Sequence, residues 1–147
     1  MYDILRHSHS GLRYVVLALL LAAIFKNFLK WQSKAPFTDG DRKLNLFTMT
    51  SAHIQLLLGI VMYLISPKVQ FNAGMMKDSM LRFFTIEHNL MMLIAIALIT
   101  IGYSKSKKAT DDVRKFKLAF IYFLIALLVV LIGIPWPFRE NLGGSWF

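Results

Sequence analysis

Four long apolar segments, separated by three polar connections, make up most of this chain of 147 residues. Because about 20 apolar residues are enough to cross the hydrocarbon core of a bilayer as a helix, each segment predicts one membrane span. The spans are expected at about 6–26, 44–66, 82–103 and 117–134. We therefore predict an all-α fold, a polytopic membrane four-helix bundle with up-and-down connectivity, forming a single domain over residues 1–147. The alternative is three spans, with the less apolar first segment lying on the membrane surface.

Turn-forming residues separate the spans. The first connection, QSKAPFTDGDRK, contains Pro, Asp and Gly, and Asp39 or Asp41 is expected to cap the second span. Pro67 is expected to end the second span and Pro135 the fourth. The first apolar segment is not followed by a small-residue cleavage site, so we expect it to be retained as a span.

Basic residues predict the orientation in the membrane. Of the 17 Lys and Arg residues, 11 lie in or beside the first and third connections. By the positive-inside rule these two connections face the cytoplasm, and both termini and the central connection face the outer, periplasmic side. We therefore expect a multi-pass protein of the bacterial inner membrane. The basic residues occupy short loops rather than one continuous face, so the expected surroundings are the lipid bilayer and no nucleic acid.

Composition agrees with several membrane spans and excludes some kinds of site. Hydrophobic residues make up 56% of the chain and charged residues 17%, and the mean hydropathy is +0.54. A soluble domain of this size seldom has such a composition. The chain has no cysteine, which excludes disulfides, thiolate metal sites, iron–sulfur clusters and covalent c-type haem attachment.

Histidines inside three predicted spans are the main chemical signal: His9, His53 and His88. One intramembrane histidine would ordinarily be interpreted as a hydrogen bond between helices. Three histidines in three spans favour a bound cofactor instead. Neutral imidazole is a good ligand for haem iron, and two imidazoles on facing helices would form a six-coordinate site for haem b.

Depth in the membrane ranks the possible pairs. With a rise of about 1.5 Å per residue, His88 lies ~9 Å and His9 ~5 Å below the outer ends of their spans, whereas His53 lies ~20 Å down. We therefore predict His88 and His9 as axial ligands, with His53 as the second choice of partner. If His53 does not bind that iron, it should bind a second cofactor or hydrogen-bond within the bundle. His7 lies about 200° around the helix from His9, so both cannot face one site.

Three arginines at the outer boundary are candidate partners for haem propionates. Arg13 follows His9 by four residues and shares its helix face, which suits a propionate partner. Arg82 and Arg139 are assigned the same role, with snorkelling to lipid phosphates as the equal alternative. Glu87 is expected to form a structural ion pair with Arg13 or Arg82.

Small residues form two stripes. Ala95 and Gly102 follow His88 at intervals of seven, which permits either a flat macrocycle or close helix contact. The stripe on the second span is interpreted as a helix contact. It consists of Ala52, Gln55, Gly59 and Tyr63.

Five stretches are distributed along the chain: HSGLRY at 9–14, DGDRKLNLFT at 39–48, AHIQLLLGIVMYLISPKVQF at 52–71, LRFFTIEH at 81–88 and IPWPFR at 134–139. On these stretches the chain resembles short four-span bacterial membrane proteins named as b-type cytochromes. The resemblance implies a four-helix membrane architecture and a b-type haem. The unit is also distantly similar to half of a haem A synthase, whose acidic outer-loop motif has no match here.

We therefore predict a membrane b-type cytochrome that transfers electrons through a bis-His haem, with quinol as a candidate partner. If the protein is an enzyme, it is expected to be a haem-dependent membrane oxidoreductase. One alternative is a non-enzymatic accessory subunit, whose partners are the other membrane subunits of a respiratory or secretion complex. Another is a small enzyme of haem or lipid chemistry.

Overall fold

The computed structural model describes residues 1–146, and every regular element in that range is a helix. Four helical segments are long and apolar enough to cross a membrane, as the sequence predicted. They are α1 (Tyr2–Gln32), α2 (Asp39–Ile65), the segment Ser79–Lys108 and α5 (Asp112–Gly133). The third segment is built from α3 (Ser79–Arg82), a π-helical turn η1 (Phe83–Glu87) and α4 (His88–Lys108). A short 3₁₀ helix, η2 (Glu140–Leu142), lies in the C-terminal tail.

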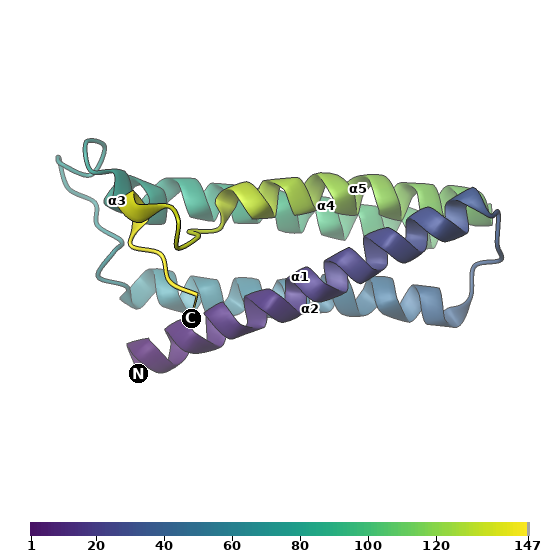
Figure 1. Ribbon diagram of the computed structural model, residues 1–147, viewed down its shortest axis with the longest axis horizontal. Coiled ribbons are helices and arrows are strands. Elements are labelled where there is room, and N and C mark those ends of the chain that lie inside the picture. Colours follow the sequence, from purple (N-terminus) through teal and green to yellow (C-terminus); the bar gives the residue numbers. More distant parts are fainter. Residues whose placement is uncertain (147) are drawn as a thin grey trace.

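The helices form an up-and-down bundle (Figure 1). The N-terminus, the C-terminal tail and the connection between α2 and α3 lie at one end, and the other two connections lie at the opposite end. Helix α1 packs against α2 and α5, α4 packs along α5, and α2 contacts α4. The first segment is therefore a full member of the bundle, which disfavours the three-span alternative.

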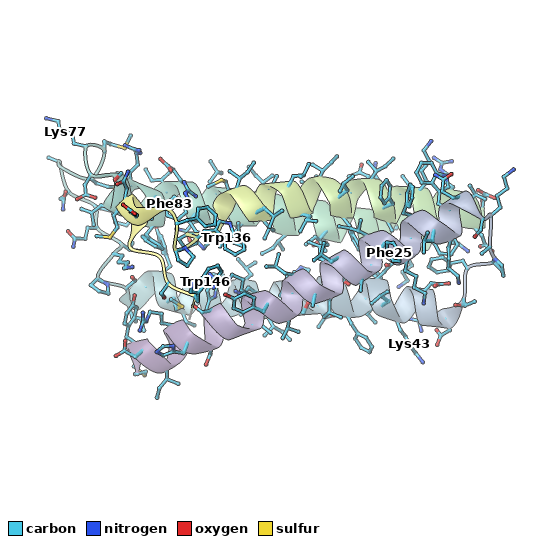
Figure 2. All side chains as sticks on the ribbon, in the orientation of Figure 1. Phe25, Lys43, Lys77, Phe83, Trp136 and Trp146 are labelled. Atoms are coloured by element: carbon cyan, nitrogen blue, oxygen red, sulfur yellow. The ribbon has the colours of Figure 1, made fainter. Side chains whose placement is uncertain are left out.

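Apolar side chains both fill the bundle and cover its outside. The core contains Leu20, Ala23 and Phe123, each 0% exposed. Other large apolar side chains point outward, among them Phe25 on α1, which is 65% exposed (Figure 2). Long helices satisfy their backbone polar groups internally, and apolar side chains on their outer surface can face lipid without leaving polar groups unpaired.

Thr38 is the N-cap residue of α2, and Asp41, one of the two predicted caps, completes the cap from inside the helix. The Thr38 hydroxyl accepts a hydrogen bond from the Asp41 backbone N–H at 3.4 Å, and the Asp41 carboxylate accepts one from the Thr38 N–H at 2.9 Å. This reciprocal arrangement is a capping box, in which the residue three positions into the helix supplies the second half of the cap.

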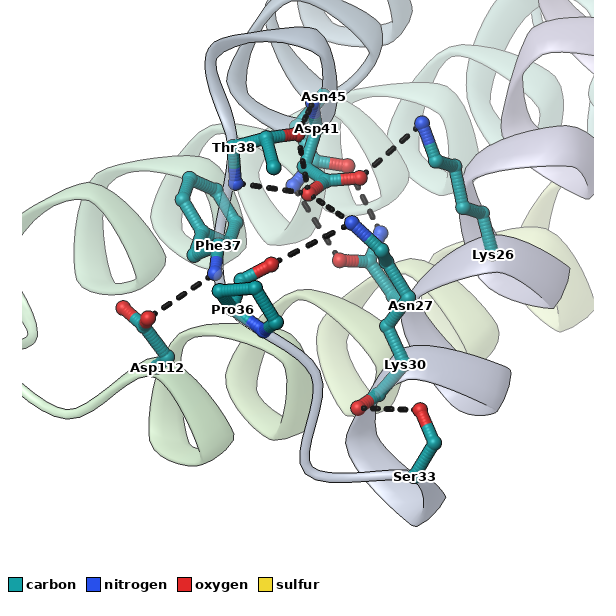
Figure 3. A network of polar contacts seen from close by, with 10 residues as sticks. All are labelled: Lys26, Asn27, Lys30, Ser33, Pro36, Phe37, Thr38, Asp41, Asn45 and Asp112. Carbon is teal, nitrogen blue, oxygen red and sulfur yellow. Dashed lines mark hydrogen bonds and ion pairs between the residues drawn. The ribbon is translucent and has the colours of Figure 1, made fainter.

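A buried polar cluster around Asp41 joins α1 to α2 at the end opposite the termini (Figure 3). The Asp41 side chain is 2% exposed and lies 2.6 Å from Lys30 Nζ and 3.0 Å from Lys26 Nζ. Beside it, Asn27 Nδ2 donates to Asn45 Oδ1 at 2.8 Å. The two lysines pair with the Asp41 carboxylate, and this attraction offsets the desolvation cost of burying its charge.

Candidate functional site

The structure brings His9 of α1 and His88 of α4 together near the end of the bundle that holds the termini. Their ring centroids lie 6.5 Å apart, and the ring planes are inclined at 70°. The two residues are 79 positions apart in the sequence, so their approach is produced by the packing of the bundle. Among residues 1–146, no group of three or more His, Cys, Asp or Glu side chains converges on one point, so these two imidazoles stand as a pair.

A π-helical turn directly precedes His88. In η1 the backbone N–H of His88 bonds to the Phe83 carbonyl, five residues earlier, and the Asn89 side chain donates to the Phe84 carbonyl at 2.6 Å. A π turn accommodates one extra residue, which rotates the preceding segment by about 100° relative to an unbroken α-helix. Such turns are frequent at functional sites. No residue pattern around Phe83–Glu87 indicates this turn in advance.

His88 is held in a single orientation by the end of α5. Its Nδ1 lies 2.7 Å from the backbone carbonyl oxygen of Gly133. Because a carbonyl oxygen can only accept, Nδ1 carries the proton and Nε2 keeps its lone pair. Gly133 makes this approach possible, since a Cβ at that position would collide with the Met92 side chain. A metal-binding imidazole characteristically has its second nitrogen bonded in this way.

His9 is positioned by two residues of α2. Gln55 Nε2 donates to the His9 backbone carbonyl at 2.8 Å, and a Cβ on Gly59 would come within 3.3 Å of His9 Cε1. The His9 Nδ1 atom is buried and has no hydrogen-bond partner among the described residues. The same holds for Gln55 Oε1. The site therefore contains polar atoms whose hydrogen-bonding capacity is unused.

A cavity of about 460 Å³ surrounds the two imidazoles. Its walls come from α1, α2, α4, the end of α5 and residues 143–145 of the tail. Away from the histidines the lining is apolar, with Val16, Ile96 and Val130 among its residues. An apolar cavity of several hundred Å³ with a few convergent polar groups is the usual form of a cofactor or ligand site.

Both small-residue stripes reach this cavity. Ala95 lines it, whereas Gly102 is packed against Tyr122 of α5, so the stripe provides a close helix contact at Gly102 and borders the cavity at Ala95. The stripe on α2 was interpreted as a helix contact rather than a site. All four of its residues line the cavity, as well as touching neighbouring helices.

Of the three candidate arginines, Arg13 alone lines this cavity. Its Nη2 donates to the Trp146 carbonyl at 2.8 Å, and its guanidinium lies 5.9 Å from the Trp136 ring centroid. Arg82 and Arg139 line a separate hollow of about 440 Å³ instead.

These two arginines have partners of their own. Arg82 Nε lies 2.6 Å from Glu87 Oε1, which is one of the two ion pairs predicted for Glu87. Arg139 donates to the Ile132 carbonyl at 2.9 Å and lies over the Phe83 ring, 5.0 Å from its centroid. Arg139 therefore joins the C-terminal tail to η1, and Arg82 is tied to η1 through Glu87.

His53 lies outside the cavity lining and has both ring nitrogens engaged. Its Nδ1 donates to the Met49 carbonyl at 2.8 Å, and its Nε2 lies 3.3 Å from the Thr100 hydroxyl of α4. This is the hydrogen-bonded arrangement within the bundle that was expected if His53 did not bind the iron. His7 is exposed, with its Nε2 3.4 Å from Arg6 Nη2.

Two cavity-lining cations were not among the predicted site residues. Arg6 lies one turn before His9 on α1, and Lys68 follows the end of α2. Arg6 could have been found from its spacing of three from His9. No periodicity relates Lys68 to the histidines, because the connection that carries it is irregular.

Comparison of the chain with known protein families, with curated proteins and with solved structures gave no match.

Proposed function

We propose that the protein is a membrane b-type cytochrome in which His9 and His88 are the axial ligands of one haem b. The observation that carries the proposal is the pair itself: two imidazoles from different spans face one apolar cavity, and the Nδ1 of His88 is bonded to Gly133. That hydrogen bond leaves the Nε2 lone pair of His88 available for a metal.

The spacing of the rings supports this proposal. If both imidazoles held one metal ion, their ring centres would be about 6.4 Å apart, from about 2.0 Å for each metal–nitrogen distance and about 1.2 Å from each nitrogen to its ring centre. The observed separation is 6.5 Å. The angle of 70° between the ring planes would be compatible with both imidazoles holding one metal ion.

The surroundings favour electron transfer over substrate chemistry. A haem with two imidazole ligands supplies a one-electron couple and has no open coordination position. The apolar lining contributed by Val16, Ile96 and Val130 would exclude water from the flat face of such a cofactor. A quinol is the candidate electron donor, because it dissolves in the bilayer that surrounds the bundle.

We infer the orientation from charge, as the sequence indicated. The two connections at the end opposite the termini, together with the helix ends that adjoin them, carry 11 of the 17 Lys and Arg residues, which favours a cytoplasmic position for that end in a bacterial inner membrane. The cavity would then lie near the periplasmic face. Cysteine labelling of positions 2 and 108 in intact cells tests this inference, which predicts labelling at position 2 alone.

The test of function is the optical spectrum of the detergent-purified protein after expression with ample haem. We expect a Soret band that shifts on reduction with dithionite, and loss of haem in the His88→Ala and His9→Ala variants. His53→Ala should retain haem, and His7→Ala is the matched control on α1. A colourless wild-type protein would favour the accessory-subunit alternative.

The variants also discriminate between the possible ligand pairs. Loss of haem in the His88 and His53 variants, with His9→Ala unaffected, would replace His9 by His53 as the second ligand. Full haem content in His88→Ala would overturn the site.

A further inference from the structure

Three cations line the cavity, and no acidic residue does. Arg6 and Arg13 come from α1 and Lys68 from the connection after α2, and the lining contains neither Asp nor Glu. Cations next to an apolar cavity are costly in free energy unless an anion or a set of hydrogen-bond acceptors lies beside them.

The described residues satisfy these cations only in part. Arg13 donates to the Trp146 carbonyl through Nη2, while its Nε is buried without a partner. Arg6 Nε is also buried without a hydrogen-bond partner, and its one ion pair in residues 1–146 is a 3.7 Å contact with Asp3, whose side chain is 79% exposed. Lys68 Nζ lies 3.4 Å from the Gly143 carbonyl.

The charges also act on one another. Burial lowers the pKa of the Lys68 ammonium, and the positive charge of Arg6 lowers that pKa further. Like charges that repel across a shared space are stabilised when an anion enters it.

The three cations come from parts of the chain at the end of the bundle that holds the termini. Arg6 lies one turn nearer the N-terminus than His9, and Lys68 follows the C-terminus of the antiparallel helix α2. Side chains on a helix lean toward its N-terminus, so Arg13 extends back toward the level of His9 and the tail. Arg13 and Lys68 both contact backbone carbonyls of the tail, at Trp146 and Gly143. The three positive groups therefore line the cavity at the end nearest the termini, which we call its mouth, and Val16, Ala95 and Val130 line it farther from that end.

We propose that Arg6, Arg13 and Lys68 form an anion subsite that binds the two carboxylate groups of the cofactor. The inference rests on the proposed function, and it assigns the haem propionates to this mouth rather than to Arg82 and Arg139. Guanidinium groups recognise carboxylates through paired hydrogen bonds, and a lysine adds a compact charge. Lipid phosphate is the other source of the same anionic chemistry.

The experiment titrates haem-free protein in detergent with iron protoporphyrin IX and with its dimethyl ester, which has the same ring and no carboxylates. We expect the wild type to bind the diacid about tenfold or more tightly than the diester. Arg6→Gln, Arg13→Gln and Lys68→Gln should each reduce this preference, while the spectrum of the bound form keeps its two imidazole ligands.

The matched control is Lys77→Gln, which removes the same charge from the same connection at a residue outside the cavity lining. It should leave the preference unchanged. Arg13→Lys should restore part of the preference lost in Arg13→Gln, which separates loss of charge from misfolding. Helix content by circular dichroism checks each variant.

Equal binding of diacid and diester by the wild type would overturn the subsite while leaving the proposed function intact. Failure to bind either compound would overturn the proposed function, and this inference with it. A third outcome would assign the cations to lipid. In that case the wild type shows no preference for the diacid, and the variants retain less bound phosphatidylglycerol, relative to phosphatidylcholine, than the wild type does. That result would overturn the assignment to the cofactor.

Discussion

His88 and Gly133 are joined by a hydrogen bond of 2.7 Å between the imidazole Nδ1 and the backbone carbonyl oxygen. The bond connects α4 to the last residue of α5, at the level where His88 faces His9. It determines which nitrogen of His88 is protonated, and it thereby makes the end of α5 part of the site.

Gly133→Ala should weaken this connection. The added methyl group would collide with Met92, so the end of α5 must shift and the carbonyl with it. We expect a loss of about 1–3 kcal/mol in stability, which is usual for overpacking, together with a lower haem content. Thermal unfolding in detergent and the ratio of haem to protein measure the two effects. Gly11→Ala is the control, because nothing lies within 4 Å of a Cβ at that position. Wild-type behaviour of Gly133→Ala in both assays would contradict the prediction.

Gly59→Ala should disturb His9 and leave His88 in place. Its Cβ would lie 3.3 Å from His9 Cε1, so the imidazole must move by a few tenths of an ångström. Since iron–imidazole bonds depend steeply on distance, we expect the absorption spectrum to gain a high-spin fraction, as for an iron with one imidazole ligand. The same Gly11→Ala variant serves as the control. A purely low-spin spectrum at full haem content would show that the cavity tolerates the methyl group.

Asp41→Asn should destabilise the bundle without altering the site. Asp41 is 2% exposed and joins Lys26 and Lys30, so its neutralisation leaves two cations without their partner. Removing one member of a buried pair costs about 3–5 kcal/mol, and the partial exposure of both lysines reduces this to about 1–3 kcal/mol. The melting temperature measures the loss, and the haem spectrum should be unchanged.

Asp39→Asn is the matched control for that experiment. Asp39 is 58% exposed and pairs with Arg42 and Lys43 at the surface. Exposed pairs contribute at most about 1 kcal/mol, so the melting temperature should change little. If the two variants lost equal stability, burial of the Asp41 cluster would not be what stabilises this end of the bundle.

Lys68→Met should have opposite effects on the empty and the loaded protein. Because burial and Arg6 lower the pKa of Lys68, the charged form is disfavoured in the folded protein, and its removal should raise the melting temperature of the haem-free form. With the cofactor bound, the same change removes a partner of the carboxylates and should weaken binding.

Raising the pH should stabilise the haem-free protein for the same reason, because it removes the charge of Lys68. For a lysine with a lowered pKa, the unfolded chain binds more protons than the folded one between the two pKa values. The stability of the haem-free protein should therefore rise as the pH increases through the lowered pKa, and this rise should be absent in Lys68→Met. Melting temperatures across the alkaline range measure it. A rise of equal size in the variant would assign the effect to another group.

The number and order of the membrane-length helices could be predicted from the sequence, because each depends on local composition. The helices themselves extend beyond the predicted spans: the first, expected at about 6–26, is Tyr2–Gln32, and the third, expected at about 82–103, is Ser79–Lys108. Twenty apolar residues suffice for a span whatever surrounds them, and proline and capping residues end helices by local hydrogen bonding. The level of a residue along its helix follows in the same way from a constant rise per residue. This is why counting placed His9 and His88 at similar depths.

Rotation about each helix axis was decided by the tertiary structure. The π-helical turn Phe83–Glu87 alters the register before His88, and no local residue pattern announced it. Arg82 and Arg139 belong to the end of the bundle that holds the termini, yet they face Glu87 and Phe83 rather than the cavity. Conversely, Lys68 reaches the cavity from an irregular connection whose path depends on contacts with the tail. Depth in a membrane is set by the geometry of one helix alone, whereas the direction a side chain faces is set by all the helices that pack against it.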